Sequence, residues 1–155
     1  FSPLRSLHSL HSEKRRLNKR YVHYNLHRNL VMSYKLFYGG KGFIISFSGI
    51  VSIDELNEGN GDIQGHEKFD NHRYQIVDLR EADLSGVSLE ETEEPAGTDL
   101  FASMINTSVR IALIVSDVIA HTVCQEFVNK SLAIGSPWKY GIFYDYDKAL
   151  TWAKT

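Results

Sequence analysis

The sequence predicts one α/β domain with a mixed sheet of about five strands flanked by helices. The segment 109–117, VRIALIVSD, contains five consecutive apolar residues, which is typical of a strand covered on both faces in a parallel sheet. Before it, two strand-like segments on either side of a glycine-rich turn predict an antiparallel hairpin. After the hairpin, strands and helices alternate, and right-handed crossovers make such strands parallel.

The hairpin comes first in the domain. Residues 33–38, SYKLFY, alternate apolar and polar side chains, and residues 43–51, FIISFSGIV, form the second strand. Gly39, Gly40 and Gly42 in the turn can adopt positive φ. The later strands are expected at 74–79, 109–116 and 138–144, with a charged loop at 80–83.

Two capping boxes mark helix starts. Ser52 with Glu55 predicts a helix at 52, although the glycines at 59, 61 and 65 predict that it is short or broken. Ser88 with Glu91 repeats the pattern, but the proline at 95 and the glycine at 97 are expected to interrupt that helix. The next helix is therefore expected at 98–106, and its apolar face is predicted to hold Leu100, Phe101 and Met104.

The last two helices follow the strands at 109–116 and 138–144. Ser116 and Asp117 offer caps for a helix at 118–132, and Asp145 offers one for a helix at 146–153. The buried stripe of the longer helix is predicted to hold four apolar residues: Val118, Ile119, Val123 and Phe127. The shorter helix is expected to pack Ala149, Leu150 and Trp152.

Charge divides the chain of 155 residues into two parts. Residues 1–31 hold seven Lys or Arg and one acid, a net charge of +6, whereas residues 32–155 hold ten Lys or Arg and eighteen acids, a net charge of −8. We expect 1–31 to be a disordered or non-native basic leader, with a transit peptide or an arm that binds a nucleic acid or an anionic surface as alternatives. Met32 is then the natural start of a single domain at 32–155, and the leader is expected to be dispensable.

Composition limits the functional classes. One cysteine, Cys124, cannot form an internal disulfide, which favours a reducing compartment and a cytoplasmic location. The longest apolar stretch is broken at Asp117 and is too short for a membrane span. No nucleic-acid partner is expected for the acidic domain, and an exposed hairpin edge allows a homodimer.

Several short sequence segments resemble those of a known family. The sequences GIVSIDEL at 49–56, YQIVDL at 74–79, RIALIV at 110–115 and GIF at 141–143 followed by ALTW at 149–152 resemble the SpoIIAA-like family, a relative of the STAS and Sec14-like folds. The resemblance covers about Met32 to Trp152 and implies an antiparallel hairpin followed by parallel β-α units. It implies no particular biochemistry.

Candidate site residues gather where the parallel strands are expected to end, because ligands of open α/β sheets bind at the carboxyl ends of the strands. This candidate ligand edge consists of Asp78, Arg80, Ser116, Asp117, Tyr144 and Asp145. Three acids at strand ends suit cation binding or acid–base catalysis, but helix capping and a local Asp78–Arg80 pair are the favoured interpretation.

Other polar residues have ordinary explanations. His121 and Cys124 are one helical turn apart, but a metal site needs further ligands, so His121 is expected to pair with Asp117 and Cys124 to pack in the core. His66 and His72 are expected on the surface. No metal and no cofactor is therefore expected.

A phosphorylation switch is a further hypothesis. STAS anti-sigma-factor antagonists carry an Asp-Ser-Ser/Thr-Gly phrase at a helix start, and this chain departs from it with DLSG at 83–86 followed by Ser88. A phosphate on Ser88 would gain from the helix dipole, and Glu90 and Glu91 would oppose it. Ser85 is the other serine of this segment.

The leading functional hypothesis is a non-enzymatic, STAS-like interaction or regulatory module that contacts an unidentified protein through a helix face and the acidic segment 83–94. The alternative is a Sec14-like carrier of a lipid or small apolar molecule, suggested by the aromatic residues of the strands. An enzyme that uses the acids at the strand ends is a third hypothesis.

Overall fold

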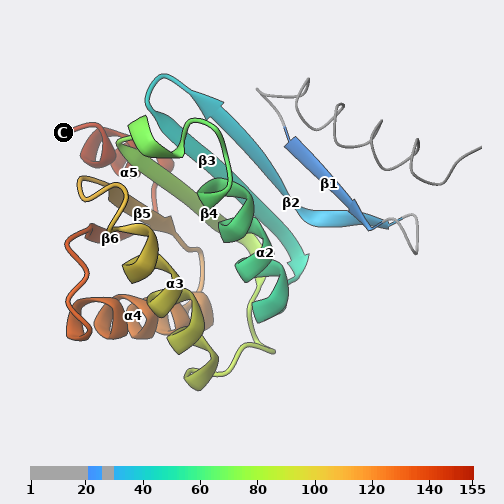
Figure 1. Ribbon diagram of the computed structural model, residues 1–155. Coiled ribbons are helices and arrows are strands. Elements are labelled where there is room, and N and C mark those ends of the chain that lie inside the picture. Colours follow the sequence, from blue (N-terminus) through green and yellow to red (C-terminus); the bar gives the residue numbers. More distant parts are fainter. Residues whose placement is uncertain (1–20, 26–29) are drawn as a thin grey trace, which may run out of the picture.

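The computed structural model describes the backbone of residues 21–25 and 30–155, and side chains from Tyr34 onward (Figure 1). A six-stranded sheet has the strand order β1-β2-β3-β4-β5-β6. Its strands are β1 (Tyr21–Asn25), β2 (Leu30–Gly39), β3 (Gly42–Ile50), β4 (Tyr74–Asp83), β5 (Arg110–Ile114) and β6 (Lys139–Phe143). The first three strands pair antiparallel and the rest pair parallel, so the predicted mixed sheet with an initial hairpin is confirmed.

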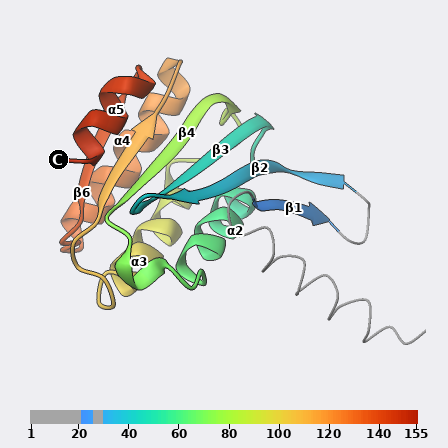
Figure 2. The same cartoon turned by 90° about the horizontal axis from the view of Figure 1, so that it is seen from above.

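Helices cover both faces of the sheet. They are α2 (Ile53–Gln64), α3 (Glu93–Ala102), α4 (Val118–Ala133) and α5 (Tyr146–Ala153), with short 3-10 helices η1 (Phe69–Asn71) and η2 (Glu90–Thr92). The larger core cluster joins one sheet face to the crossover helices, and a smaller cluster joins the opposite face to α5. Figure 2 shows the sheet between α5 and the pair α2 and α3.

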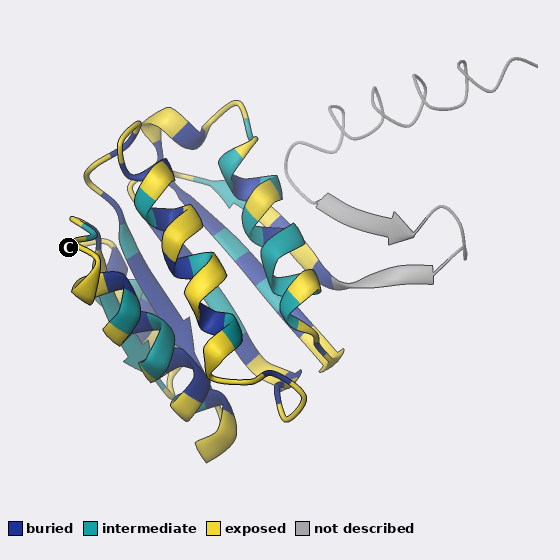
Figure 3. Ribbon diagram, turned by 60° about the horizontal axis from the view of Figure 1, so that its bottom comes forward, coloured by how far each residue is buried: buried dark blue, intermediate teal, exposed yellow. Residues whose placement is uncertain are grey.

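The predicted central strand lies in the interior. The residues from Ile111 to Val115 are all buried, because α4 packs on one face and α5 on the other. Side chains alternate between the two clusters, with Ile111 and Leu113 in the larger one and Ala112 and Ile114 in the smaller one. Figure 3 shows the buried strands beneath helices whose outer surfaces are exposed.

Helix α2 continues through its glycines, so the predicted break is wrong. Ser52 caps it by accepting a hydrogen bond from the Glu55 amide, as predicted. A Cβ at Gly59 would lie 2.6 Å from Ile45 Cδ1 and 2.9 Å from Phe47 Cζ. The missing side chain therefore allows α2 to approach β3 closely, a packing gain that outweighs the poor helix propensity of glycine.

Helix α3 begins earlier than predicted, at Glu93 instead of 98. Pro95 lies in its first turn, where backbone N–H groups have no partner within the helix, so the proline removes no hydrogen bond. The predicted apolar face is also wrong, because Phe101 and Met104 are exposed. The helix instead buries Ala96, Asp99 and Ala102.

Two further boundaries differ from the predictions. β4 continues to Asp83, so the expected charged loop at 80–83 is strand, paired to β3 beyond a register shift at Ser46 and Ser48. α4 has the predicted start, but Val118 and Ile119 are exposed instead of buried. The buried face of α4 begins instead with Ala120, Val123 and Cys124.

The predicted leader lies partly within the described residues. β1 and the start of β2 belong to 1–31 and pair with each other, whereas 1–20 and 26–29 lie outside the described residues. The prediction that the domain begins at Met32 and does not need the leader stays a prediction.

Candidate functional site at the carboxyl edge of the sheet

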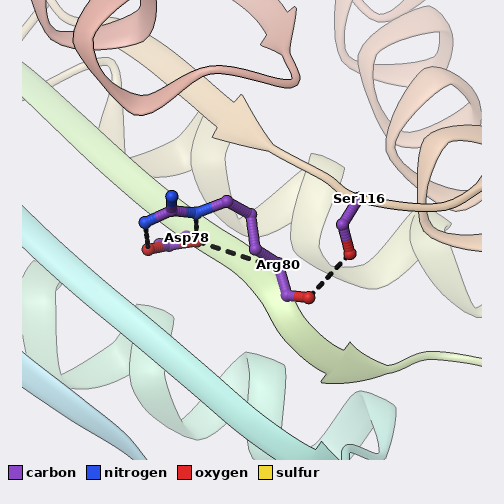
Figure 4. Close-up of polar contacts among 3 residues, drawn as sticks. All are labelled: Asp78, Arg80 and Ser116. Carbon is purple, nitrogen blue, oxygen red and sulfur yellow. Dashed lines mark hydrogen bonds and ion pairs between the residues drawn. The ribbon is translucent and has the colours of Figure 1, made fainter.

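The predicted Asp78–Arg80 pair is confirmed. The Arg80 guanidinium donates to both carboxylate oxygens of Asp78, from Nε to Oδ1 at 2.9 Å and from Nη2 to Oδ2 at 2.8 Å (Figure 4). The Arg80 amide also donates to Oδ1 at 3.1 Å. The hydrogen bonds with Asp78 raise the pKa of Arg80. The guanidinium lies 5.4 Å from the centroid of the Tyr146 ring, a cation–π contact with α5.

Ser116 connects the ends of β4 and β5. Its hydroxyl donates to the Arg80 carbonyl at 2.6 Å, across 36 positions of sequence (Figure 4). The structure thus brings together Asp78, Arg80 and Ser116, although these three groups mainly satisfy one another. Their hydrogen bonds leave no base beside a nucleophile, so their geometry gives no catalytic constellation.

The other two acids of the candidate ligand edge cap helices, as favoured by the sequence. Asp117 accepts a hydrogen bond from the Ala120 amide at 2.8 Å, and Asp145 accepts one from the Lys148 amide at 2.9 Å. Each carboxylate satisfies one N–H group that has no partner in the first turn, and each gains from the positive end of the helix dipole.

Tyr144 contacts the first turn of α4. Its ring stacks on His121 with a centroid separation of 5.9 Å and an interplanar angle of 11°. The expected His121–Asp117 side-chain pair does not form, because Asp117 is the helix cap. Cys124 packs in the core as predicted, and burial raises the pKa of its thiol to about 12, which keeps it protonated and unreactive.

Four large apolar side chains are exposed at the end of β3, after β6 and at the start of α4. Ile50 at the end of β3 is 80% exposed, Val118 and Ile119 at the start of α4 are 77% and 54% exposed, and Tyr144 is 59% exposed. These four residues are called the apolar rim. Neighbouring strands are about 4.8 Å apart, so β3 and β6 are about 15 Å apart across the sheet. Ile50 also lies four residues further along β3 than Ser46, which is level with the ends of β5 and β6. Two of these residues, Val118 and Ile119, were predicted from the sequence to be buried.

Ser88 forms the predicted capping box. Its amide donates to Glu91 Oε1 at 2.8 Å, and its hydroxyl accepts from the Glu91 amide at 3.3 Å. The residue is exposed and begins the segment of η2 and α3. Asp83 accepts from the Ser85 amide, and hydrogen bonding with Ser85 lowers the Asp83 pKa. Phosphorylation of Ser88 stays a prediction.

Sequence reasoning missed a buried carboxyl group on α3. Asp99 is only 2% exposed, and its Oδ1 accepts hydrogen bonds from Asn60 Nδ2 at 3.0 Å and Gln64 Nε2 at 3.2 Å. Burial raises the pKa of Asp99 to about 7, although both hydrogen bonds oppose this change. The acid follows Thr98 in an acidic segment, and no local pattern distinguished it from the solvated acids.

His72 was also misplaced, because it is fully buried instead of exposed. Its ring contacts the Phe69 carbonyl and the Gln75 side chain, and burial lowers its pKa. Asn106 joins the same group by donating to the Phe69 and His72 carbonyls at 3.0 and 2.8 Å. The Trp138 indole then donates to the Asn106 carbonyl at 2.7 Å, so these polar residues support the structure of the core.

His66, predicted on the surface, is half-buried and stacks on Tyr38 with a centroid separation of 5.6 Å. Burial is the main reason that its pKa is lowered. Neither histidine is placed with the acids of the carboxyl edge, which lies at the other end of the strands. Within the part of the chain described, no group of three or more His, Cys, Asp or Glu residues is arranged to hold a metal ion.

A cavity between the sheet and α2, α3 and α4 has a volume of about 100 Å³. Its lining includes Ile45, Phe47, Cys124 and Phe127, together with Asp99. Sites for drug-sized molecules typically have a volume of about 300–1,000 Å³. The core is therefore too well filled to favour the lipid-carrier alternative. Among residues 21–25 and 30–155, no helix has the length and apolar character of a membrane span.

Comparisons with known proteins found no matching family model and no matching curated protein. A similar solved structure is the crystal structure of an uncharacterized protein of the DUF3478 family with a SpoIIAA-like fold, from Shewanella loihica PV-4. It is 14% identical, the match covers 87% of this chain and 94% of that protein, and the TM-score is 0.45.

Proposed function

We propose that this domain is a non-enzymatic, STAS-like interaction module that binds a basic protein partner through the carboxyl edge of its sheet. The observation that supports the proposal is the apolar rim, defined above as Ile50, Val118, Ile119 and Tyr144. Single exposed apolar side chains are ordinary, but several that gather at one edge are typical of an interaction surface. Val118 and Ile119 are adjacent in sequence and both face solvent.

The charge around the rim favours a basic partner. Exposed acids lie at the ends of the strands and in the first turns of the helices that follow them: Asp54, Glu81, Asp83, Asp117, Asp145 and Asp147. Arg80 on the same edge is already paired with Asp78, so it offsets little of this charge. A partner with Lys or Arg around an apolar centre would match both properties and would associate faster at low salt.

The polar geometry supports a binding role over catalysis. Ser116, Asp117 and Asp145 are engaged in a carbonyl contact and two helix caps. These bonds make the edge rigid, since they connect β4 to β5 and fix the starts of α4 and α5. A rigid surface loses less entropy on binding than a mobile one does.

The test compares two double variants at opposite ends of α4. Val118→Ser with Ile119→Ser removes half of the apolar rim, whereas Leu132→Ser with Ile134→Ser removes two exposed apolar residues at the other end of the helix. Each immobilised protein is exposed to extract from the organism that encodes the chain, at low and high NaCl, and the retained proteins are compared by quantitative mass spectrometry.

We expect one or a few basic proteins to be retained at low salt, to be released at high salt, and to be lost from the Val118/Ile119 variant only. Circular dichroism and thermal unfolding of each variant show whether the fold is intact. Equal retention by both variants, or retention of no basic protein by the unmodified domain, would contradict the proposal.

A further inference from the structure

We propose that an open pocket at the amino edge of the parallel strands binds a small phosphorylated molecule. This pocket lies at the opposite end of the strands from the apolar rim, has a volume of about 590 Å³, and is independent of the interaction surface proposed above. Five of its lining residues are basic: Lys41, Arg73, Arg110, Lys139 and Lys154. No Asp or Glu of the described chain lines it.

The concentration of positive charge is unusual for this domain. Residues 32–155 contain ten Lys or Arg and eighteen acids, so half of the basic side chains line one pocket in a part of the chain with a net charge of −8. Glu67 and Asp70 precede Arg73 in sequence, but neither lines the pocket. The five cations thus form a local positive region on an acidic protein.

Strand register brings two of the cations side by side. Tyr74, Arg110 and Lys139 are direct partners on β4, β5 and β6, so their side chains leave the same face of the sheet. The Arg110 guanidinium lies 5.2 Å from the centroid of the Trp152 ring, which places this face on the side of α5. Like charges on adjacent strands destabilise a sheet, and a bound anion would relieve that repulsion.

The other cations come from turns around this row. Gly40 has φ of +61° in the β2–β3 turn, which is followed directly by Lys41. Arg73 is the residue before β4, and its amide donates to the Lys41 carbonyl at 2.6 Å. Lys154 follows α5. Among the described residues, the ion pairs are Arg80 with Asp78 and Lys130 with Glu126. None of the five cations of the pocket takes part in either pair.

The chemistry of the pocket suits a phosphate group. Two arginines offer planar N–H pairs that match phosphate oxygens, and Thr107 and Ser108 add hydroxyl groups to the lining. The backbone carbonyls at the end of α5 oppose an anion with about half a negative charge, which is small beside five cations. The pocket volume lies in the range of about 300–1,000 Å³ typical of small-molecule sites.

Tyr74 forms an aromatic wall that an organic part of the ligand can contact. A Cβ at Gly42 would lie 2.0 Å from Tyr74 Cε2, so the ring lies directly over the backbone of β3. This close approach requires glycine at 42 and keeps the ring in one place. The pocket therefore combines a fixed apolar surface with five cations, which suits a molecule that carries more than one phosphate group on a small organic body.

The experiment measures pyrophosphate binding by isothermal titration calorimetry, at an ionic strength held constant with NaCl and with sulfate as the competing anion. The test variant is Arg73→Gln with Lys139→Gln, two exposed cations of the pocket. The matched control is Lys35→Gln with Lys148→Gln, two exposed lysines outside the pocket that change the net charge by the same −2.

We expect pyrophosphate to bind more tightly than sulfate. The Arg73/Lys139 variant should bind it at least about tenfold more weakly, because two charge-assisted contacts are lost, and the control should retain its affinity. Equal weakening in both variants, or no preference over sulfate, would overturn the proposal by showing an unspecific charge effect. Binding of a single-stranded oligonucleotide without binding of pyrophosphate would also overturn it, in favour of a nucleic-acid surface.

Discussion

Replacement of Asp99 by Asn should stabilise the domain at alkaline pH and leave it little changed at acidic pH. Asp99 is buried, and its pKa in the folded protein is about 7, compared with the ordinary value of 3.8. Between these two values the folded state binds one more proton than the unfolded chain does. The free energy of unfolding therefore decreases as the pH rises from about 4 to 7, and the loss is complete above the folded pKa.

The magnitude follows from the two pKa values. At about 1.4 kcal/mol per pKa unit, the difference between 3.8 and about 7 corresponds to at most about 4 kcal/mol at pH 8. Asparagine has nearly the same volume and retains a carbonyl oxygen for the hydrogen bonds from Asn60 and Gln64, but it carries no charge at any pH. We expect Asp99→Asn to gain several kcal/mol at pH 8 and at most about 2 kcal/mol at pH 5, because pH 5 already lies above the ordinary pKa of 3.8.

Urea unfolding of both proteins at pH 5 and pH 8 measures this effect. The difference between variant and unmodified protein at each pH cancels the contributions of other titrating groups, including His72. Asp83→Asn is the matched control, because hydrogen bonding with Ser85 lowers the pKa of this exposed carboxyl, so its replacement should give no gain at pH 8. If Asp99→Asn changed the stability equally at pH 5 and pH 8, the buried carboxyl would not titrate as argued.

Four further predictions concern the core. Gly59→Ala should lower the free energy of unfolding in urea by about 1–3 kcal/mol, because its Cβ would overlap Ile45, and an unchanged midpoint would contradict that packing. Asn106→Ala should cost at least about 2 kcal/mol in the same assay, since two buried carbonyls lose their donor; a smaller loss would make this amide dispensable. Because the pKa of His72 is lowered in the folded protein, the free energy of unfolding should decrease as the pH falls below 6.5. His72→Gln should make this decrease smaller, and an equally large decrease in the variant would show that other groups cause it. Cys124 should react with a thiol reagent only as fast as the domain unfolds, and rapid labelling of the folded protein would show that it is accessible.

The candidate site was predicted in part. The Asp78–Arg80 pair and the caps at Asp117 and Asp145 follow from neighbours within four residues, so the sequence contains the partners needed to infer them. The apolar rim and the basic pocket instead consist of residues from segments that are far apart in the sequence. Lys41 and Lys154 are more than a hundred positions apart, and only the order and register of the strands place them at one edge.

The sequence by itself determined the order of the elements from β2 to α5, the hairpin of β2 and β3, the buried character of 111–115 and the caps of three helices, because these depend on local periodicity and short-range hydrogen bonds, but it did not predict β1. Only the tertiary structure decided which helix faces are buried. Val118 is exposed and Asp99 is buried because burial depends on what each helix packs against, and small residues such as Ala96 and Ala102 allow α3 to approach its neighbours closely. Contacts between distant segments thus decide both proposed sites.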